Sequence, residues 1–216
     1  MGLLEAIVVV YLRKIFYSTG FKFPLEIIPG PILKIEVLRE FCTLIMILSV
    51  AFIAGKNRLQ VFAYFLFCFA VWDIFYYIGL KLMLNWPASF LTWDILFLIP
   101  VPWISPVLVP IISSIFMIVF SLLLIFKGKN NRDFKIKITE WIFLCLGALL
   151  IFISFIWNYT SIIISKYLFE HIITLNPDNF GSLTTNNIPT YFPWNIFVPG
   201  MLLIWFSIYT IWKRKI

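Results

Sequence analysis

The sequence contains apolar runs that are too long for the core of a water-soluble domain. Residues 104–126 include the stretch ISSIFMIVFSLLLIF and carry no charged side chain. A helix needs about 20 apolar residues to cross the hydrocarbon core of a bilayer. Four further segments meet or nearly meet that length, at residues 37–54, 59–84, 138–165 and 195–212. The pattern therefore predicts helices that cross a membrane several times.

The composition agrees with a chain surrounded by lipid. Hydrophobic residues make up 62% of the sequence and charged residues 12%, whereas soluble domains have roughly 45–50% and 25%. A soluble protein this apolar would lack the polar side chains needed to cover its surface. The predicted fold class is an all-α polytopic membrane bundle that forms a single domain over residues 1–216, with the lipid bilayer as its main partner.

One further segment, residues 3–20, is ambiguous. Its apolar run is interrupted by Arg13 and Lys14. The segment can span the bilayer with these charges snorkelling to the surface, or it can lie in the interface as an amphipathic anchor. We expect it to span, which gives about six membrane spans.

Basic residues predict the orientation of the chain, because positively charged short loops stay in the cytoplasm. Lys56 and Arg58 flank one turn, five Lys and Arg side chains lie within residues 127–137, and Lys213 opens a basic C-terminus. With six spans, these places fall on one face and both termini are cytoplasmic. The net charge of +7 is then explained by cytoplasmic loops and anionic lipid. A plasma (inner) membrane location is expected, and no nucleic-acid partner.

The opposite face is predicted to carry two long connections, at residues 21–36 and 166–193. Near this face the sequence LIPVPWISPVLVP places prolines at positions 100, 102, 106 and 110. Each proline removes an amide donor and disfavours helix in the preceding residue. We therefore expect residues 91–103 to form a short re-entrant segment or half helix that is broken by proline.

Asp73 is the main candidate for a functional residue. It lies about 18 Å from the outer end of its predicted helix, near the middle of the bilayer. An ionised carboxyl group there costs at least about 2.5–3.5 kcal/mol, so it marks a candidate binding or proton site. Tyr76 and Tyr77 follow on the same helical face, and Pro100 and Pro102 break the backbone at a similar depth. The alternative is a structural Asp73, protonated or hydrogen-bonded to fix helix packing.

A second Trp-Asp-Ile triplet places Asp94 in the sequence after the turn at Pro87. If the chain doubles back there, Asp94 reaches the depth of Lys81. We therefore predict a structural ion pair between Lys81 and Asp94. Charged residues near the start of the apolar segment at residues 37–54 have spacings that suit local ion pairs on a solvated face; they are Glu36, Arg39 and Glu40.

The sequence does not contain the usual signatures of an enzyme. A single histidine, His171, does not allow bis-histidine haem ligation or a histidine-rich metal cluster. Phosphate-binding loops, HExxH and GxSxG are also missing. No catalytic residue, metal or cofactor is predicted.

Three function classes remain. The first is a small transporter or proton-coupled carrier with Asp73 as its protonatable group. The second is a non-catalytic subunit of a larger membrane complex, whose apolar faces contact other subunits or a second copy in a homo-oligomer. The third, less favoured, is an enzyme on a lipid or isoprenoid substrate that uses Asp73 and Asp94 as an acid/base pair.

Overall fold

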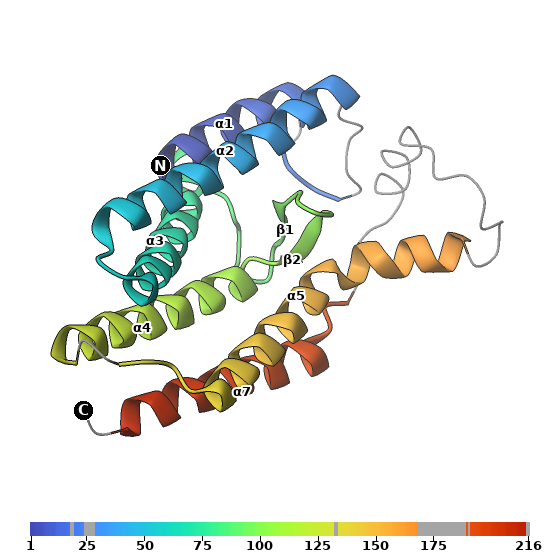
Figure 1. Cartoon of the computed structure of the whole chain (residues 1–216). Coiled ribbons are helices and arrows are strands. Elements are labelled where there is room, and N and C mark those ends of the chain that lie inside the picture. Colours follow the sequence, from blue (N-terminus) through green and yellow to red (C-terminus); the bar gives the residue numbers. More distant parts are fainter. Residues whose placement is uncertain (18–19, 24–28, 132–133, 168–188, 190, 215–216) are drawn as a thin grey trace.

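The computed structural model describes residues 1–17, 20–23, 29–131, 134–167, 189 and 191–214. These residues form six helices and one two-stranded sheet (Figure 1). In chain order the elements are α1 (Gly2–Phe16), α2 (Gly30–Ala54), α3 (Arg58–Leu84), β1 (Trp93–Phe97), β2 (Trp103–Pro106), α4 (Leu108–Asn130), α5 (Ile138–Tyr167) and α7 (Trp194–Lys213).

Five of the helices are long and apolar enough to cross a membrane. They are Gly30–Ala54, Arg58–Leu84, Leu108–Lys129, Ile138–Ser161 and Trp194–Lys213. Their outward surfaces are rich in large apolar side chains such as Phe52, Ile53 and Trp212, as expected for helices in contact with lipid. The predicted fold class, an all-α polytopic membrane bundle, is confirmed.

The first helix, α1, is not one of these five. It has 15 residues and is about 22 Å long, while the hydrocarbon core is about 30 Å thick. It lies against the second half of α3: a methyl group on Gly2 would lie 2.5 Å from the carbonyl oxygen of Trp72, and one on Gly79 would lie 2.6 Å from Cβ of Ala6. The sixth span over residues 3–20, and the cytoplasmic position of Met1 that depends on it, stay predictions.

The half helix expected at residues 91–103 is wrong. The segment is a β-hairpin whose strands β1 and β2 pair antiparallel, with Trp93 opposite Pro106 and Asp94 opposite Ser105. Prolines exclude a helix, but a short two-stranded ribbon tolerates proline at positions that need no amide donor. The strands satisfy each other's backbone groups, which a chain surrounded by apolar helices requires.

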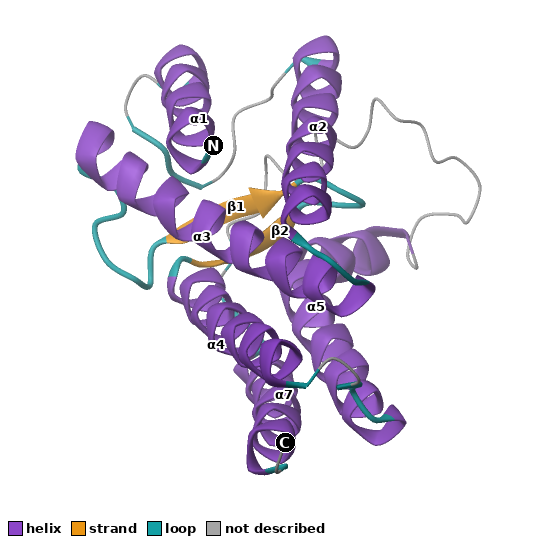
Figure 2. Cartoon of the chain, turned by 60° about the vertical axis from the view of Figure 1, so that its left-hand side comes forward, coloured by secondary structure: helices purple, strands orange, loops and turns teal. Residues whose placement is uncertain are grey.

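The hairpin occupies the centre of the molecule. Figure 2 shows it between α1 and α2 on one side and α4, α5 and α7 on the other, with α3 running past both groups. Its inward aromatic residues join two apolar clusters. Phe97 packs with Ile47 and Trp72, and Trp103 contacts the cluster around Phe155.

The helices on the second side pack in pairs, α3 along α4 and α5 along α7. Gly147 and Gly200 allow the second pair to approach closely. A methyl group on Gly147 would lie 2.7 Å from the carbonyl oxygen of Gly200, and one on Gly200 would lie 3.0 Å from the carbonyl oxygen of Gly147. Small residues at a crossing are the usual way for membrane helices to bring their backbones together.

Candidate binding site on two faces of α3

A cavity of about 480 Å³ lies between α3, α4, α5, α7 and the hairpin. Its volume falls in the range of roughly 300–1,000 Å³ that is typical of small-molecule sites. We call it the large cavity. Its walls are mainly aromatic and aliphatic side chains, among them Phe69, Leu96, Trp103, Phe116, Phe120, Trp141, Ile151, Phe152, Phe155 and Met201.

Two aromatic pairs lie among the residues that line the large cavity. At the end near the α2–α3 turn, the rings of Phe62 and Trp141 are 5.4 Å apart. At the hairpin end, Trp103 stacks on Phe155 with ring centroids 5.3 Å apart and an interplanar angle of 26°. These contacts join α3 to α5 at one end and β2 to α5 at the other.

Asp73 is the only residue with a charged side chain among those that line the large cavity, all of which lie in the described part of the chain. It sits near the middle of α3, about 16 Å before the end of that helix. The hydroxyl group of Ser114 on α4 donates a hydrogen bond to its Oδ2 at 2.7 Å. Ser113, next along α4, donates to the carbonyl group of Val109 in its own helix. Asp73 and Ser114 therefore form one polar spot in an apolar wall.

A second cavity, of about 130 Å³, lies on the other face of α3, and we call it the small cavity. Its lining is rich in charge. It includes the carboxyl groups of Glu5, Glu36, Glu40, Asp73 and Asp94 and the guanidinium groups of Arg13 and Arg39. Trp72, Asp73 and Leu96 line both cavities. The two cavities thus meet at Asp73.

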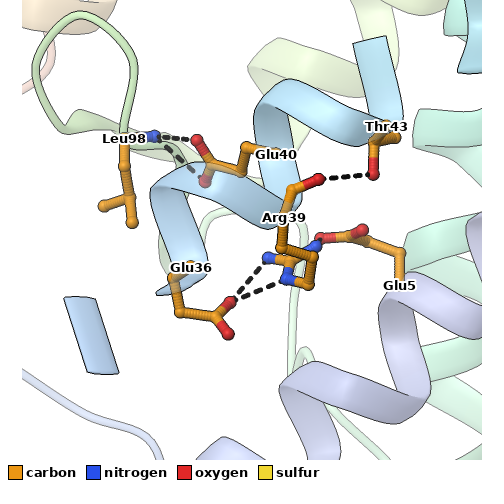
Figure 3. A network of polar contacts seen from close by, with 6 residues as sticks. All are labelled: Glu5, Glu36, Arg39, Glu40, Thr43 and Leu98. Carbon is orange, nitrogen blue, oxygen red and sulfur yellow. Dashed lines mark hydrogen bonds and ion pairs between the residues drawn. The ribbon is translucent and has the colours of Figure 1, made fainter. Parts of the chain in front are cut away.

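Three of these charged groups form a network between α1 and α2, shown in Figure 3. Arg39 donates to Glu36 at 2.8 Å and pairs with Glu5 across the helix interface. The predicted solvated face on α2 is wrong, because Glu36 and Glu40 are only 7% and 6% exposed. Among apolar helices, these charged groups are stabilised by ion pairs with one another and by the hydrogen bond to the hairpin.

Glu40 connects α2 to the hairpin. Both of its carboxylate oxygens accept the backbone N–H of Leu98, at 2.9 and 3.1 Å (Figure 3). Leu98 follows β1 directly, where the chain turns towards β2. Glu40 therefore holds the turn of the hairpin against α2.

The predicted ion pair between Lys81 and Asp94 is not formed. Asp94, 1% exposed, pairs with Arg13 of α1 at 2.9 Å and accepts a hydrogen bond from the hydroxyl group of Tyr77 at 3.2 Å. Lys81 instead donates to the carbonyl groups of Asn85 and Pro87 at 3.4 and 3.0 Å.

Asp94 pairs with Arg13 and not with Lys81 because of the surroundings of Arg13 on α1. The guanidinium group of Arg13 lies over two rings that meet edge to face, 3.8 Å from the centroid of Trp86 and 4.2 Å from that of Phe21. A planar guanidinium group is suited to stacking on rings while it binds a carboxylate, and a lysine ammonium group is less so. Lys81 also lies near the end of α3, where free backbone carbonyl groups attract a cation.

The other predicted site residues are Tyr76, Tyr77, Pro100 and Pro102, and the structure places them differently. Tyr76 lines the small cavity together with Asp73 and Asp94. Tyr77 is buried, but it binds Asp94 and not Asp73. Pro100 and Pro102 lie in the turn between β1 and β2 and are not among the residues that line either cavity.

Sequence reasoning missed Arg13, Glu40 and Ser114 as site residues. Glu36 and Glu40 had a usable signal, because residues four apart share one face of a helix, and two carboxyl groups on one face of a membrane helix imply a buried polar site. Ser114 and Arg13 had no comparable signal. Their partners are 41 and 81 residues away.

Within the described ranges, no group of three or more His, Cys, Asp or Glu side chains is arranged to hold a metal ion. The carboxyl groups of the small cavity are spread along its length and engage amide, hydroxyl and guanidinium donors. Such an arrangement can exchange protons and bind water, and beside the large cavity it can bind the polar end of an apolar molecule. Comparison with protein-family models, with curated proteins and with solved structures finds no match to this chain.

Proposed function

We propose that this multi-pass membrane protein is a small proton-coupled carrier for a hydrophobic molecule with one cationic or hydrogen-bond-donating end. The observation that carries the proposal is the large cavity, about 480 Å³ in volume, in which Asp73 is the only charged lining residue among the described residues.

The walls of the large cavity favour the apolar body of such a substrate. Rings such as Phe69, Trp103 and Phe152 offer flat apolar surfaces, and burial of apolar area contributes about 25 cal/mol for each Å² removed from water. Few other polar atoms line the large cavity, so the orientation of the substrate depends on the polar spot formed by Asp73 and Ser114.

Asp73 supplies the switch that a coupled carrier needs. An ionised carboxyl group in apolar surroundings is costly unless a cation or a proton neutralises it. A cationic substrate end and a proton therefore compete for the same oxygen atoms. Protonation of Asp73 releases the substrate, and substrate binding releases the proton.

Uptake into proteoliposomes tests this function. The purified chain is reconstituted, a pH gradient is imposed, and uptake of tetraphenylphosphonium and of a radiolabelled long-chain alkylamine is measured. We expect gradient-driven uptake of at least one probe in the native protein and its loss in Asp73→Asn. Ser113→Ala is the matched control, because that hydroxyl group lines the same wall but bonds only to its own helix. Equal uptake by the native protein and Asp73→Asn would refute the proposal.

A further inference from the structure

We infer that the small cavity is a hydrated path that delivers protons to Asp73 from the α1–α2 side, with Glu40 as the relay. This inference rests on the proposed function, because it names the coupling ion and the route by which that ion reaches the site. The ligands are water and exchangeable protons.

The first observation is that Asp73 belongs to both cavities. The small cavity extends from Asp73 past Asp94 and Glu40 to Leu33 and Tyr17, which lie near the ends of α2 and α1 that are joined by residues 17–29. One face of α3 thus offers the substrate a place beside Asp73, and the other face offers a separate approach to the same carboxyl group.

The second observation is the charge of the small cavity. Five carboxyl groups and two guanidinium groups line it, a formal excess of three negative charges when all are ionised. Apolar surroundings do not hold such an excess without neutralising cations. Because the described residues form no cluster suited to a metal ion, protons are the cations that fit.

The third observation is a buried donor with no partner. Arg13 is 7% exposed and lines the small cavity. Its Nη2 binds Asp94, but no group among the described residues accepts from its Nη1. Nearly all buried donors have a partner, and ordered water takes that place where no protein group does. A volume of about 130 Å³ has room for about four water molecules at roughly 30 Å³ each.

Glu40 is the carboxyl group best placed to pass a proton. Glu36 and Glu5 share the guanidinium group of Arg39, and Asp94 is held by Arg13, so each of these three carboxyl groups already has a cationic partner. Glu40 accepts from the amide of Leu98, and it forms no ion pair within the described residues.

The groups that surround Asp73 are consistent with this route. Ser114 on α4 donates to Asp73, and the other polar or charged side chains that line the small cavity with it come from four elements: Tyr76 on α3, Asp94 on β1, Glu36, Arg39 and Glu40 on α2, and Glu5, Arg13 and Tyr17 at α1. When a cationic substrate binds from the large cavity, the Asp73 carboxyl group gives its proton to water in the small cavity. That water passes a proton to the Glu40 carboxylate, which releases one to the outer water. The reverse sequence returns one proton and releases the substrate.

Substituted cysteines test whether the small cavity holds water. In a variant with Cys42, Cys68 and Cys145 replaced by Ser, Glu40→Cys is compared with Phe41→Cys, whose side chain is 54% exposed on the outward surface of α2. A charged, membrane-impermeant thiosulfonate is added to either side of proteoliposomes. Only a hydrated thiol forms the reactive thiolate, so we expect Glu40→Cys to react at least about tenfold faster, and from one side only.

A second pair of variants covers the case in which Glu40→Cys does not fold. Val9→Cys on α1 lines the small cavity without a polar contact to lose, and Tyr11→Cys, 63% exposed, points outward. The same preference is expected. Equal labelling within both pairs, or labelling from both sides, would overturn the inference.

Glu40→Gln then tests the relay itself. Uptake driven by a pH gradient should fall severalfold, while exchange of substrate at equal pH on both sides should be unchanged, a difference that a merely structural role would not produce. If gradient-driven uptake depends on Asp73 but the cavity does not label, the path is refuted and the carrier stands. If the cavity labels but uptake is indifferent to Asp73, the carrier is refuted and the hydrated path stands.

Discussion

The two faces of α3 differ sharply in how they treat charge. Towards α1, α2 and the hairpin, α3 borders the small cavity with its five carboxyl and two guanidinium groups. Towards α4, α5 and α7 it borders a cavity more than three times larger with one charged lining residue. Most of the charged groups thus lie on the face towards α1, α2 and the hairpin, and the Asp73 carboxyl group is the one that lines both cavities.

The difference teaches that the two sides hold their shape by different forces. Directional ion pairs and hydrogen bonds fix the side of α1, α2 and the hairpin, and they fail when one partner is removed. On the side of α4, α5 and α7 the ion pair between Glu140 and Arg214 lies outside the large cavity. Apolar contacts form most of the wall of that cavity, and they tolerate changes of shape and volume more readily. Substitutions on the charged face should therefore cost stability, while those in the large cavity should mainly change binding.

The largest expected effect is from Arg13→Ala. Its removal leaves Asp94 buried without its cation, which typically costs about 3–5 kcal/mol. The free energy of unfolding in mild detergent should fall by that amount. The double variant Arg13→Ala with Asp94→Asn should recover part of the loss, because no charge is then buried alone. A double variant as unstable as the single one would contradict the pairing.

A smaller effect is expected from Glu40→Ala, which removes the acceptor for the amide of Leu98 and should cost about 1–3 kcal/mol. Glu40→Gln keeps an oxygen acceptor in the same place and should cost less than half of that. Unfolding of both variants in the same detergent checks this order. If the two variants are equally stable, the hairpin is not held through Glu40.

Ser114→Ala should cost about 0.5–1.5 kcal/mol, the usual net value of one hydrogen bond, because the hydroxyl group is buried against Asp73. Ser113→Ala should change stability less, since its hydroxyl group only bonds back to its own helix. The same unfolding assay compares the two. A larger loss of stability in Ser113→Ala than in Ser114→Ala would contradict a stabilising hydrogen bond between Ser114 and Asp73.

The smallest effect on stability is expected where the large cavity is filled. Ala148→Trp adds an aromatic ring to its wall and should cost less than about 1 kcal/mol, below the 1–3 kcal/mol of an overpacked core. Substrate uptake should nevertheless fall strongly, because the ring takes the space of the substrate. Leu149→Trp, on an exposed position of α5, is the control and should leave uptake unchanged.

The sequence predicted the membrane helices well and the segment between α3 and α4 poorly. An apolar run must be long to cross a bilayer, so length and hydropathy alone located α2, α3, α4, α5 and α7. Prolines at 100 and 102 excluded a helix, but they did not indicate that residues 93–97 would pair with 103–106. That pairing depends on the surrounding helices, which exclude water from the backbone.

The candidate site was predictable only in part. Asp73 stood out because a carboxyl group in an apolar run is rare. The partner of Asp94 could not be found, because the depth argument considered only the chain on either side of Pro87, and Arg13 arrives on a helix from elsewhere. Its position is set by the close packing of Gly2 and Ala6 of α1 against α3, a contact that no local pattern specifies.

The contact between Gly147 and Gly200 has a mechanical consequence. Each backbone sits where a side chain of the other would lie, so α5 and α7 cannot roll over or slide past each other without steric clash. We therefore expect α5 and α7 to tilt together. A change in the width of the large cavity would then be a movement of this pair against α3 and α4, and the aromatic pairs Phe62–Trp141 and Trp103–Phe155 are among the contacts that such a tilt would separate.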